Sequence, residues 1–303
     1  MKKKINTALP ALSRMGVLLL IIVMGVIIDP SFLSLRNISN NLANASILII
    51  LGVGETVAII TNGPDLSAGS IMTMGGVVTA ILLKNYQIHF VVAILGGLAV
   101  GALLGAINGY MIAYIKIPAF ISTYGLQWAV FGFAYVVLNG YVIYSFDDAF
   151  RFIGNGAVFK YFSMTTVCMM VIAVIGTLLL KHTTLGRKFY SVGSNAVQAN
   201  MSGIDSKKVI MKAFVFSGLM SAAAGILYVA RMNSVQSDIG SAYLLNVLAA
   251  VYSYFTVNGR KILAVGISPE ASRIAGTNVR CVKWGCMVFA GVMAGVCGIL
   301  QTI

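Results

Sequence analysis

The chain has 303 residues, of which 59% are apolar and 10% are charged, and its formal net charge is +13. Because soluble domains carry roughly 25% charged residues, this composition excludes a soluble globular protein and indicates a single polytopic membrane domain over residues 1–303. Basic cytoplasmic loops account for the positive charge without a nucleic-acid partner. The four cysteines form no Cys-x-x-Cys pair and the two histidines are far apart, so neither a metal site nor a cofactor is expected.

The apolar runs predict an all-α bundle of about nine transmembrane helices. No small-x-small cleavage site follows the basic N-terminus and the first run, so this run is expected to be a retained helix rather than a secretory signal. In chain order the predicted helices cover about 10–28, 42–61, 67–83, 90–115, 119–139, 161–180, 210–230, 242–257 and 284–303.

The distribution of basic residues predicts the orientation of these helices. If the N-terminus is cytoplasmic and the helices alternate, 16 of the 21 basic residues fall on inside loops. The opposite orientation would violate the positive-inside rule. We therefore expect the N-terminus in the cytoplasm and the loop 141–160 outside.

Acidic residues mark a break between the second and third helices. Glu55 and Asp65 are among only eight acidic residues, and Gly63-Pro64 interrupts the apolar pattern between them. A charge inside a bilayer is costly, so such residues face a polar cavity or a partner. Polar breaks of this kind occur where hydrophobic segments meet along a solute path. Asp65 could serve such a path, or Asp65 and Ser67 could cap the helix beginning near Ala68. For Glu55 an interhelical hydrogen bond is favoured over contact with a solute.

Glycines at positions 101, 105 and 109 recur every fourth residue and therefore lie on one helix face. Small residues let helix backbones approach closely in a membrane. We expect this face to pack within the chain rather than to form a dimer contact.

Residues 186–227 align without a gap to residues 259–300, and 14 of the 42 positions are identical. Each copy is a basic cytoplasmic loop followed by a helix. An even number of helices separates the copies, which makes the repeat parallel rather than inverted. From the residues alone, the loop is either a docking surface for a cytoplasmic partner or a solvated positive-inside loop.

Neither a Walker A phosphate loop nor a Ser/His/Asp set, paired-carboxylate cleft or zinc pattern is found in the sequence. The chain is therefore not expected to be an enzyme.

Several sequence blocks resemble the permease subunits of bacterial ABC importers of the ribose/xylose/galactose type. The resemblance covers about Leu18–Val251. The blocks that carry it are Asp29–Asn37 (DPSFLSLRN), Thr61–Ser70 (TNGPDLSAGS), Ile117–Thr123 (IPAFIST), Thr184–Asn195 (TLGRKFYSVGSN), Arg231–Gln236 (RMNSVQ) and Gly240–Leu245 (GSAYLL).

This resemblance implies a multi-pass protein of the bacterial cytoplasmic membrane that forms a pore with a second permease chain. An ATP-binding subunit would hydrolyse ATP in the cytoplasm, and an extracytoplasmic solute-binding protein would deliver the ligand. The residues expected along the path of a hydroxyl-rich solute are Glu55, Asn62, Asp65, Ser67 and Ser70. Those expected to couple to the ATP-binding subunit are Gly186, Arg187, Lys188, Gly193, Asn195 and Gly203, with Gly259, Arg260, Lys261, Gly266, Glu270 and Gly276 in the second copy.

Two other functions stay open at this point. An ATP-independent secondary carrier would work without an ATP-binding subunit, and such carriers often have inverted repeats. A truncated or rearranged permease that transports nothing would fit the duplicated loop.

Overall fold

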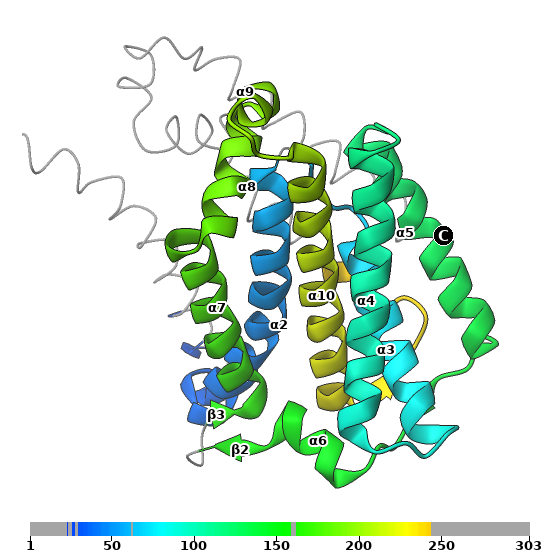
Figure 1. Cartoon of the computed structure of the whole chain (residues 1–303). Helices are drawn as coiled ribbons and strands as arrows, with labels where there is room; N and C mark the ends of the chain where they lie inside the picture. Colours follow the sequence, from blue (N-terminus) through cyan, green and yellow to red (C-terminus); the bar gives the residue numbers. More distant parts are fainter. Residues whose placement is uncertain (1–22, 24–25, 28–29, 62, 159–161, 244–303) are drawn as a thin grey trace, which may run out of the picture. The chain divides into compact units, whose positions relative to one another are not determined.

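The computed structural model describes residues 23, 26–27, 30–61, 63–158 and 162–243. The chain divides into two compact units, one of residues 34–251 and one made of 1–33 with 252–303. In the second unit, the longest described segment is the 3-10 turn η1 (Pro30–Leu33). All other elements belong to the first unit (Figure 1).

Long apolar helices dominate the first unit. Five of those described are long and apolar enough to cross a membrane: α2 (Leu35–Ile60), α4 (Phe90–Ala113), α5 (Ala119–Leu138), α7 (Met164–His182) and α10 (Ser206–Met232). A shorter apolar helix, α3 (Ala68–Lys84), follows α2 after the break at 61–67. This arrangement is an all-α polytopic bundle, as predicted.

Six predicted helices therefore correspond to observed ones, with shifts of up to seven residues at their ends. The largest shift is at the start of α2, which begins at Leu35 because the Ser34 hydroxyl accepts a hydrogen bond from the Asn37 amide. The polar run after Ser34 concealed this start in the sequence. The predicted helices 10–28, 242–257 and 284–303 lie almost entirely outside the described residues.

The long connections contain structure that the sequence analysis treated as loop. The outside connection carries α6 (Asp148–Asn155) with β1 (Ile143–Tyr144), β2 (Ala157–Val158) and β3 (Phe162–Ser163). Two antiparallel pairs form, β1 with β4 (Ser234–Val235) and β2 with β3. The connection predicted to be cytoplasmic carries α8 (Thr184–Ser194) and α9 (Ala196–Met201).

The ends of the helices agree with the predicted alternation. The α4–α5 turn and the α8–α9 segment lie at one end of the unit, and α6 with β2 and β3 lies at the other (Figure 1). At the first end, the Lys207 ammonium lies 5.6 Å from the centroid of the Tyr114 ring. The turns predicted to be cytoplasmic thus share one side.

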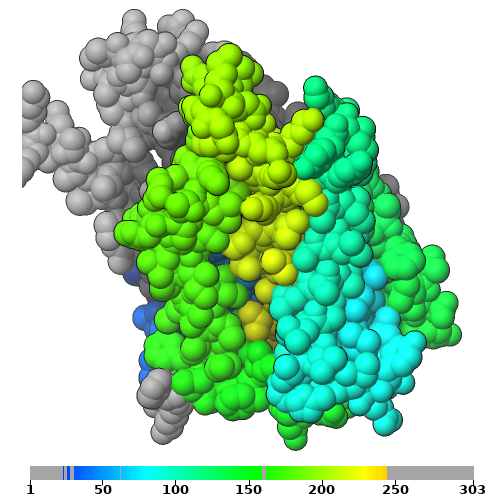
Figure 2. Space-filling model, in the orientation of Figure 1, coloured from blue at the N-terminus to red at the C-terminus, as the bar shows by residue number. Residues whose placement is uncertain are grey.

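Helix α10 is the central helix of the unit. Among the five apolar helices it buries the largest share of its apolar stretch, and it packs against α2, α3 and α4. The space-filling view shows it as a band between α7 and α4 (Figure 2). Its buried residues include many small ones, which permit this central position.

The glycine face of α4 packs on α10, which confirms the prediction of packing within the chain. A Cβ atom at Gly101 would lie 2.6 Å from the Gly218 carbonyl oxygen. At Gly105 it would collide with the Phe214 carbonyl, and at Gly109 it would lie 2.8 Å from the Met211 Cα. The two backbones are therefore in direct contact over more than two helical turns.

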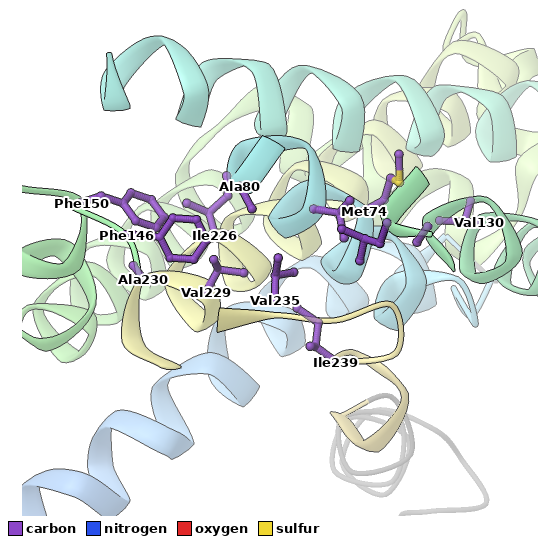
Figure 3. Packing of buried hydrophobic residues seen from close by; sticks show 13 residues of the cluster. Met74, Ala80, Val130, Phe146, Phe150, Ile226, Val229, Ala230, Val235 and Ile239 are labelled. Carbon is purple, nitrogen blue, oxygen red and sulfur yellow. The ribbon is translucent and has the colours of Figure 1, made fainter. Parts of the chain in front are cut away.

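Three apolar clusters fill the remaining interior. One cluster joins α3, α5, α6 and α10 and includes Phe146 and Phe150, whose ring centroids are 5.5 Å apart (Figure 3). A second joins α2, α3, α7 and α10. The third lies under α8, where Phe189 and Val192 pack with Val57, Val209 and Ala213.

Two glycine substitutions, one inside the contact between α4 and α10 and one outside it, should have different effects on stability. Gly105→Ala should lower the free energy of unfolding by about 1–3 kcal/mol, because the new methyl group overpacks the contact with Phe214. Gly132→Ala on α5 meets nothing within 4 Å and should be neutral or stabilising, since alanine is the better helix former. Thermal unfolding of the purified chain in detergent measures both. Equal midpoints for the two variants would contradict the close contact.

Candidate functional site

The break between α2 and α3 folds back into the bundle. Helix α2 ends at Ile60, and the Gly63 amide donates to the Ala58 carbonyl over 3.1 Å. Gly63 faces the ring of Phe214, and a Cβ atom there would lie 2.9 Å from the ring. The glycine thus lets the segment 61–67 pass between α2 and α10.

Asp65 is fully buried in this segment and accepts three hydrogen bonds. Its Oδ1 accepts from the Ser67 amide over 3.0 Å and from the Ser67 hydroxyl over 2.6 Å, and its Oδ2 accepts from the Ser217 hydroxyl over 2.8 Å. Burial of a carboxylate is tolerated when its oxygens are satisfied in this way. The carboxyl group therefore ties the segment to α10.

Glu55 braces the same segment from α2. Its Oε1 accepts from the Asp65 amide over 3.0 Å, and the side chain is 1% exposed. The bond joins α2 to the break and not to another helix, so the interhelical bond expected for Glu55 is not the one observed. Within the described part of the chain, the Glu55 Oε2 atom has no hydrogen-bond partner.

The network continues from Ser67 to two further helices. The Ser67 hydroxyl accepts from the Asn108 amide group over 2.7 Å, and Asn108 Oδ1 accepts from the Ser122 hydroxyl over 3.1 Å. All three side chains are buried. The network thus connects α2, the break, α10, α4 and α5.

The sequence analysis missed three members of this network: Asn108, Ser122 and Ser217. One signal was available for Asn108, which is the only amide side chain within the apolar, glycine-rich run of α4. Ser122 lies in the block Ile117–Thr123 that carries the family resemblance, but no role was assigned to it. Ser217 has no distinguishing signal in the sequence.

The alternative role as side-chain caps of α3 is met by Asp65 and not by Ser67, because the Asp65 Oδ1 accepts from the Ser67 amide just before the helix begins. Ser67 occupies the position before α3, but its side chain makes no capping bond, because its hydroxyl donates to Asp65. The first turn is instead supported by the backbone and by Ser70, whose hydroxyl donates to the Ser67 carbonyl over 2.9 Å.

Four of the five predicted path residues lie within the described part of the chain, where they are brought together and are closed to solvent in this conformation. Glu55 is 1% exposed, while Asp65, Ser67 and Ser70 are fully buried. Asn62 lies outside the described residues.

The α8–α9 segment positions the predicted coupling residues of the first copy. Arg187 and Lys188 are exposed, whereas Phe189 on the same helix is buried. A hollow of about 380 Å³ between α8 and the start of α10 is lined by Lys188 together with Lys208 and Lys212. Asp205 also lines the hollow and pairs with Lys208 over 3.2 Å, but the net charge of the lining residues stays positive, and the apolar lining residues are Leu185, Ile204 and Val209.

The glycines of the segment have structural roles. Gly186 packs on the last carbonyl groups of α7, and Gly193 packs directly on the Ile60 carbonyl at the end of α2. Asn195 caps α9, because its Oδ1 accepts from the Val197 amide over 3.0 Å, and Gly203 adopts a left-handed φ of 78°. The second-copy residues Gly259, Arg260, Lys261, Gly266, Glu270 and Gly276 lie outside the described residues.

One further acidic residue lies at this end. Asp205 precedes α10 and its Oδ1 accepts from the Lys208 amide over 3.2 Å. This hydrogen bond lowers the pKa of the Asp205 carboxyl below its ordinary value, because it stabilises the charged form.

A family model described as the permease component of the branched-chain amino acid transport system matches residues 37–252 and 242–303. The chain belongs to this family of transport permeases. With its apolar helices, the match identifies a multi-pass protein of the inner membrane. No solved structure matches the chain.

Curated relatives of this permease are sugar import proteins. The ribose import permease protein RbsC of Escherichia coli (strain K12) is 33% identical over 268 residues, which cover 86% of this chain and 79% of RbsC. The galactose/methyl galactoside import permease protein MglC of Haemophilus influenzae is 31% identical, over 76% of this chain and 74% of MglC. The D-allose transport system permease protein AlsC of Escherichia coli (strain K12) is 30% identical, over 80% and 75%. These relatives confirm the resemblance to monosaccharide import permeases.

The Asp65 network predicts different effects for two serines one turn apart on α10. Ser217→Ala should lower the free energy of unfolding by about 1–3 kcal/mol, since it leaves a buried carboxylate oxygen without its donor. Ser221 is equally buried, but its hydroxyl has no partner within the described part of the chain. Ser221→Ala should therefore be neutral or stabilising. Denaturant unfolding of both variants in detergent provides the comparison, and an equal loss in both would show that the bond to Asp65 contributes nothing.

Proposed function

We propose that the chain is the membrane-spanning permease subunit of an ABC importer for a monosaccharide or a similar polyhydroxylated solute. It works with a separate ATP-binding subunit, an extracytoplasmic solute-binding protein and a second permease chain. The observation that carries this proposal is the similarity to ribose, galactose and allose import permeases over most of the chain. Alternating access driven by the ATP-binding subunit is the mechanism that fits a permease of this class.

In this proposal, the α8–α9 segment docks on the ATP-binding subunit. It presents Arg187 and Lys188 on its exposed face, and its hollow with Lys208 and Lys212 suits an acidic and apolar surface of a partner. Gly186, Gly193, Asn195 and Gly203 hold the segment in shape. The second copy, from Gly259 to Gly276, falls within residues that match the same family model and supplies a second candidate for this role.

A displacement of α8 has a direct mechanical route into the bundle. Phe189 packs with Val57 near the end of α2, and Gly193 touches the Ile60 carbonyl. The break at 61–67 begins at the next residue and carries Asp65. Movement of the docked segment therefore acts first on the end of α2 and then on the network around Asp65.

The residues predicted along the path act in this proposal as positioning residues beside it. Glu55, Asp65, Ser67 and Ser70 are buried and hydrogen-bonded to protein groups. They keep the break in place, and a solute would contact them only in a conformation that opens the segment. Asn62 belongs to the same break and shares this assignment.

Purification of the chain from its native membranes in mild detergent, followed by mass spectrometry, tests the proposal. We expect an ATP-binding subunit, and after mild crosslinking a solute-binding protein, to be recovered with it. Recovery of the chain alone, combined with uptake that survives ATP depletion, would instead identify a secondary carrier. Recovery alone without uptake of any sugar would identify a permease that does not transport.

Charge reversal on α8 should separate the permease from the ATP-binding subunit. Arg187→Glu combined with Lys188→Glu should reduce co-purification of that subunit at least roughly tenfold, since two attractive charges become repulsive at a docking surface. Lys116→Glu combined with Lys181→Glu changes the same charge at the same end of the unit and should leave co-purification intact. Quantitative mass spectrometry of the recovered subunit measures both double variants. Unchanged recovery with the α8 variant would refute docking on this copy.

A further inference from the structure

One face of α5 is a continuous row of aromatic side chains. Phe120, Tyr124, Trp128, Phe131 and Tyr135 follow one another at spacings of three or four residues, which places them on one side of the helix. The successive ring centroids from Phe120 to Phe131 are 6.0, 6.3 and 6.4 Å apart. We call these five residues the aromatic face of α5.

Among the residues that the structure describes, none covers the aromatic face. Phe120 is 61% exposed, Tyr124 47% and Trp128 60%. Neither the Tyr124 hydroxyl nor the Trp128 indole N–H has a hydrogen-bond partner among the residues that the structure describes. Trp128 is the tenth of the 20 residues of α5 and so lies at the middle of the span.

Lipid is an unsuitable environment for these polar atoms. Tryptophan and tyrosine are enriched at the two membrane interfaces, and a hydrogen-bonding group without a partner in the hydrocarbon layer is costly. The tyrosines of α4 follow this rule, because Tyr110 lies in the last turn of the helix and Tyr114 just after it.

The exposed side of α7 shows the composition that lipid favours. Its exposed large residues are Met170, Val171, Val174, Ile175 and Leu178, and the one exposed polar side chain among them, Thr177, donates to the Ala173 carbonyl of its own helix over 2.8 Å. Two exposed helices of one bundle therefore differ in chemistry, and the difference points to a polar environment beside α5.

We propose that the aromatic face of α5 lines the solute path and contacts the sugar directly. This inference rests on the proposed function, because it takes the solute to be a hydroxyl-rich ring. Such a ring has C–H faces, whose positive hydrogens are attracted to the negative face of an aromatic ring. Its hydroxyl groups would pair with the Tyr124 hydroxyl and the Trp128 N–H.

The length of the row fits passage better than tight binding. A path must hold a solute at several weak sites so that it can enter and leave. Five neighbouring rings along the helix offer equivalent stacking positions without a single deep site. The buried carboxyl groups of Glu55 and Asp65 do not have to take part in this contact.

Water accessibility of the aromatic face tests the proposal in the assembled transporter. Tyr124→Cys is made in a background in which the native cysteines are replaced by alanine. Membranes containing the whole complex are treated with a charged methanethiosulfonate reagent, which reacts with thiolates in water. Phe133→Cys is the matched control, because Phe133 is an exposed aromatic residue on the opposite side of the same helix.

We expect Cys at position 124 to react at least roughly tenfold faster than Cys at position 133, and D-ribose, D-galactose or D-allose to slow this reaction. Equal, slow reaction at both positions would place the aromatic face in lipid and overturn the proposal. Oxidative crosslinking of two permease chains through position 124 would show that a second copy covers the face, and this too would overturn it.

Uptake by the complex with native cysteines gives an independent readout. Tyr124→Leu combined with Trp128→Leu should lower the initial rate of uptake roughly fivefold to tenfold, while ATPase activity and complex assembly persist. Trp128→Phe keeps an aromatic ring and should retain most of the uptake. Normal uptake by the leucine variant would overturn the inference alone, whereas no uptake of the three sugars by the unmodified complex would overturn the proposed function.

Discussion

The structure depends on one buried carboxyl group and on the donors that satisfy it. Asp65 is enclosed by an apolar bundle, and its oxygens accept from Ser67 and from Ser217. These donors come from different segments, so neither the break nor α10 can shift without leaving a buried oxygen unpaired. Ser67 extends the constraint, because its hydroxyl donates to Asp65 and accepts from Asn108. A single carboxyl group thus fixes the position of the break relative to the helices around it.

This network is possible only because the helices are close together. A serine side chain is short, and Ser217 reaches Asp65 from α10 because glycines line the adjoining helices. A Cβ atom at Gly54 would lie 3.2 Å from the Ser217 Cα, and one at Gly101 would lie 2.6 Å from the Gly218 carbonyl oxygen. Larger residues would separate the backbones and break the bond to Asp65. In a membrane, close packing and interhelical hydrogen bonds replace the hydrophobic effect as the forces that hold helices together. Here the close packing of the helices permits the hydrogen bond between Ser217 and Asp65.

Much of the fold was predictable from the sequence, because an apolar run of sufficient length has few alternatives in a bilayer. Glu55 and Asp65 were also predictable, since an acidic residue in such a run needs a partner. The hydrogen-bond partners of these two residues could not be predicted. The hydroxyl of a serine or threonine in a helix can bond to its own backbone, as Thr56 does to the Gly52 carbonyl over 2.7 Å. The sequence therefore does not distinguish a self-satisfied hydroxyl from one, such as that of Ser217, that reaches across to another helix.

The buried network and the aromatic face of α5 meet opposite physical requirements. A frame that transmits force needs strong, satisfied bonds, and a sugar that bound Asp65 would first have to displace bonds from Ser67 and Ser217. Passage needs contacts that are weak and repeated. The two meet at Ser122, which lies near the start of α5 and bonds to Asn108 of the network. Displacement of the break would therefore reach α5 at the end of the helix from which its aromatic row begins, so that the Asp65 carboxyl group would act on the proposed contact surface without itself touching the solute.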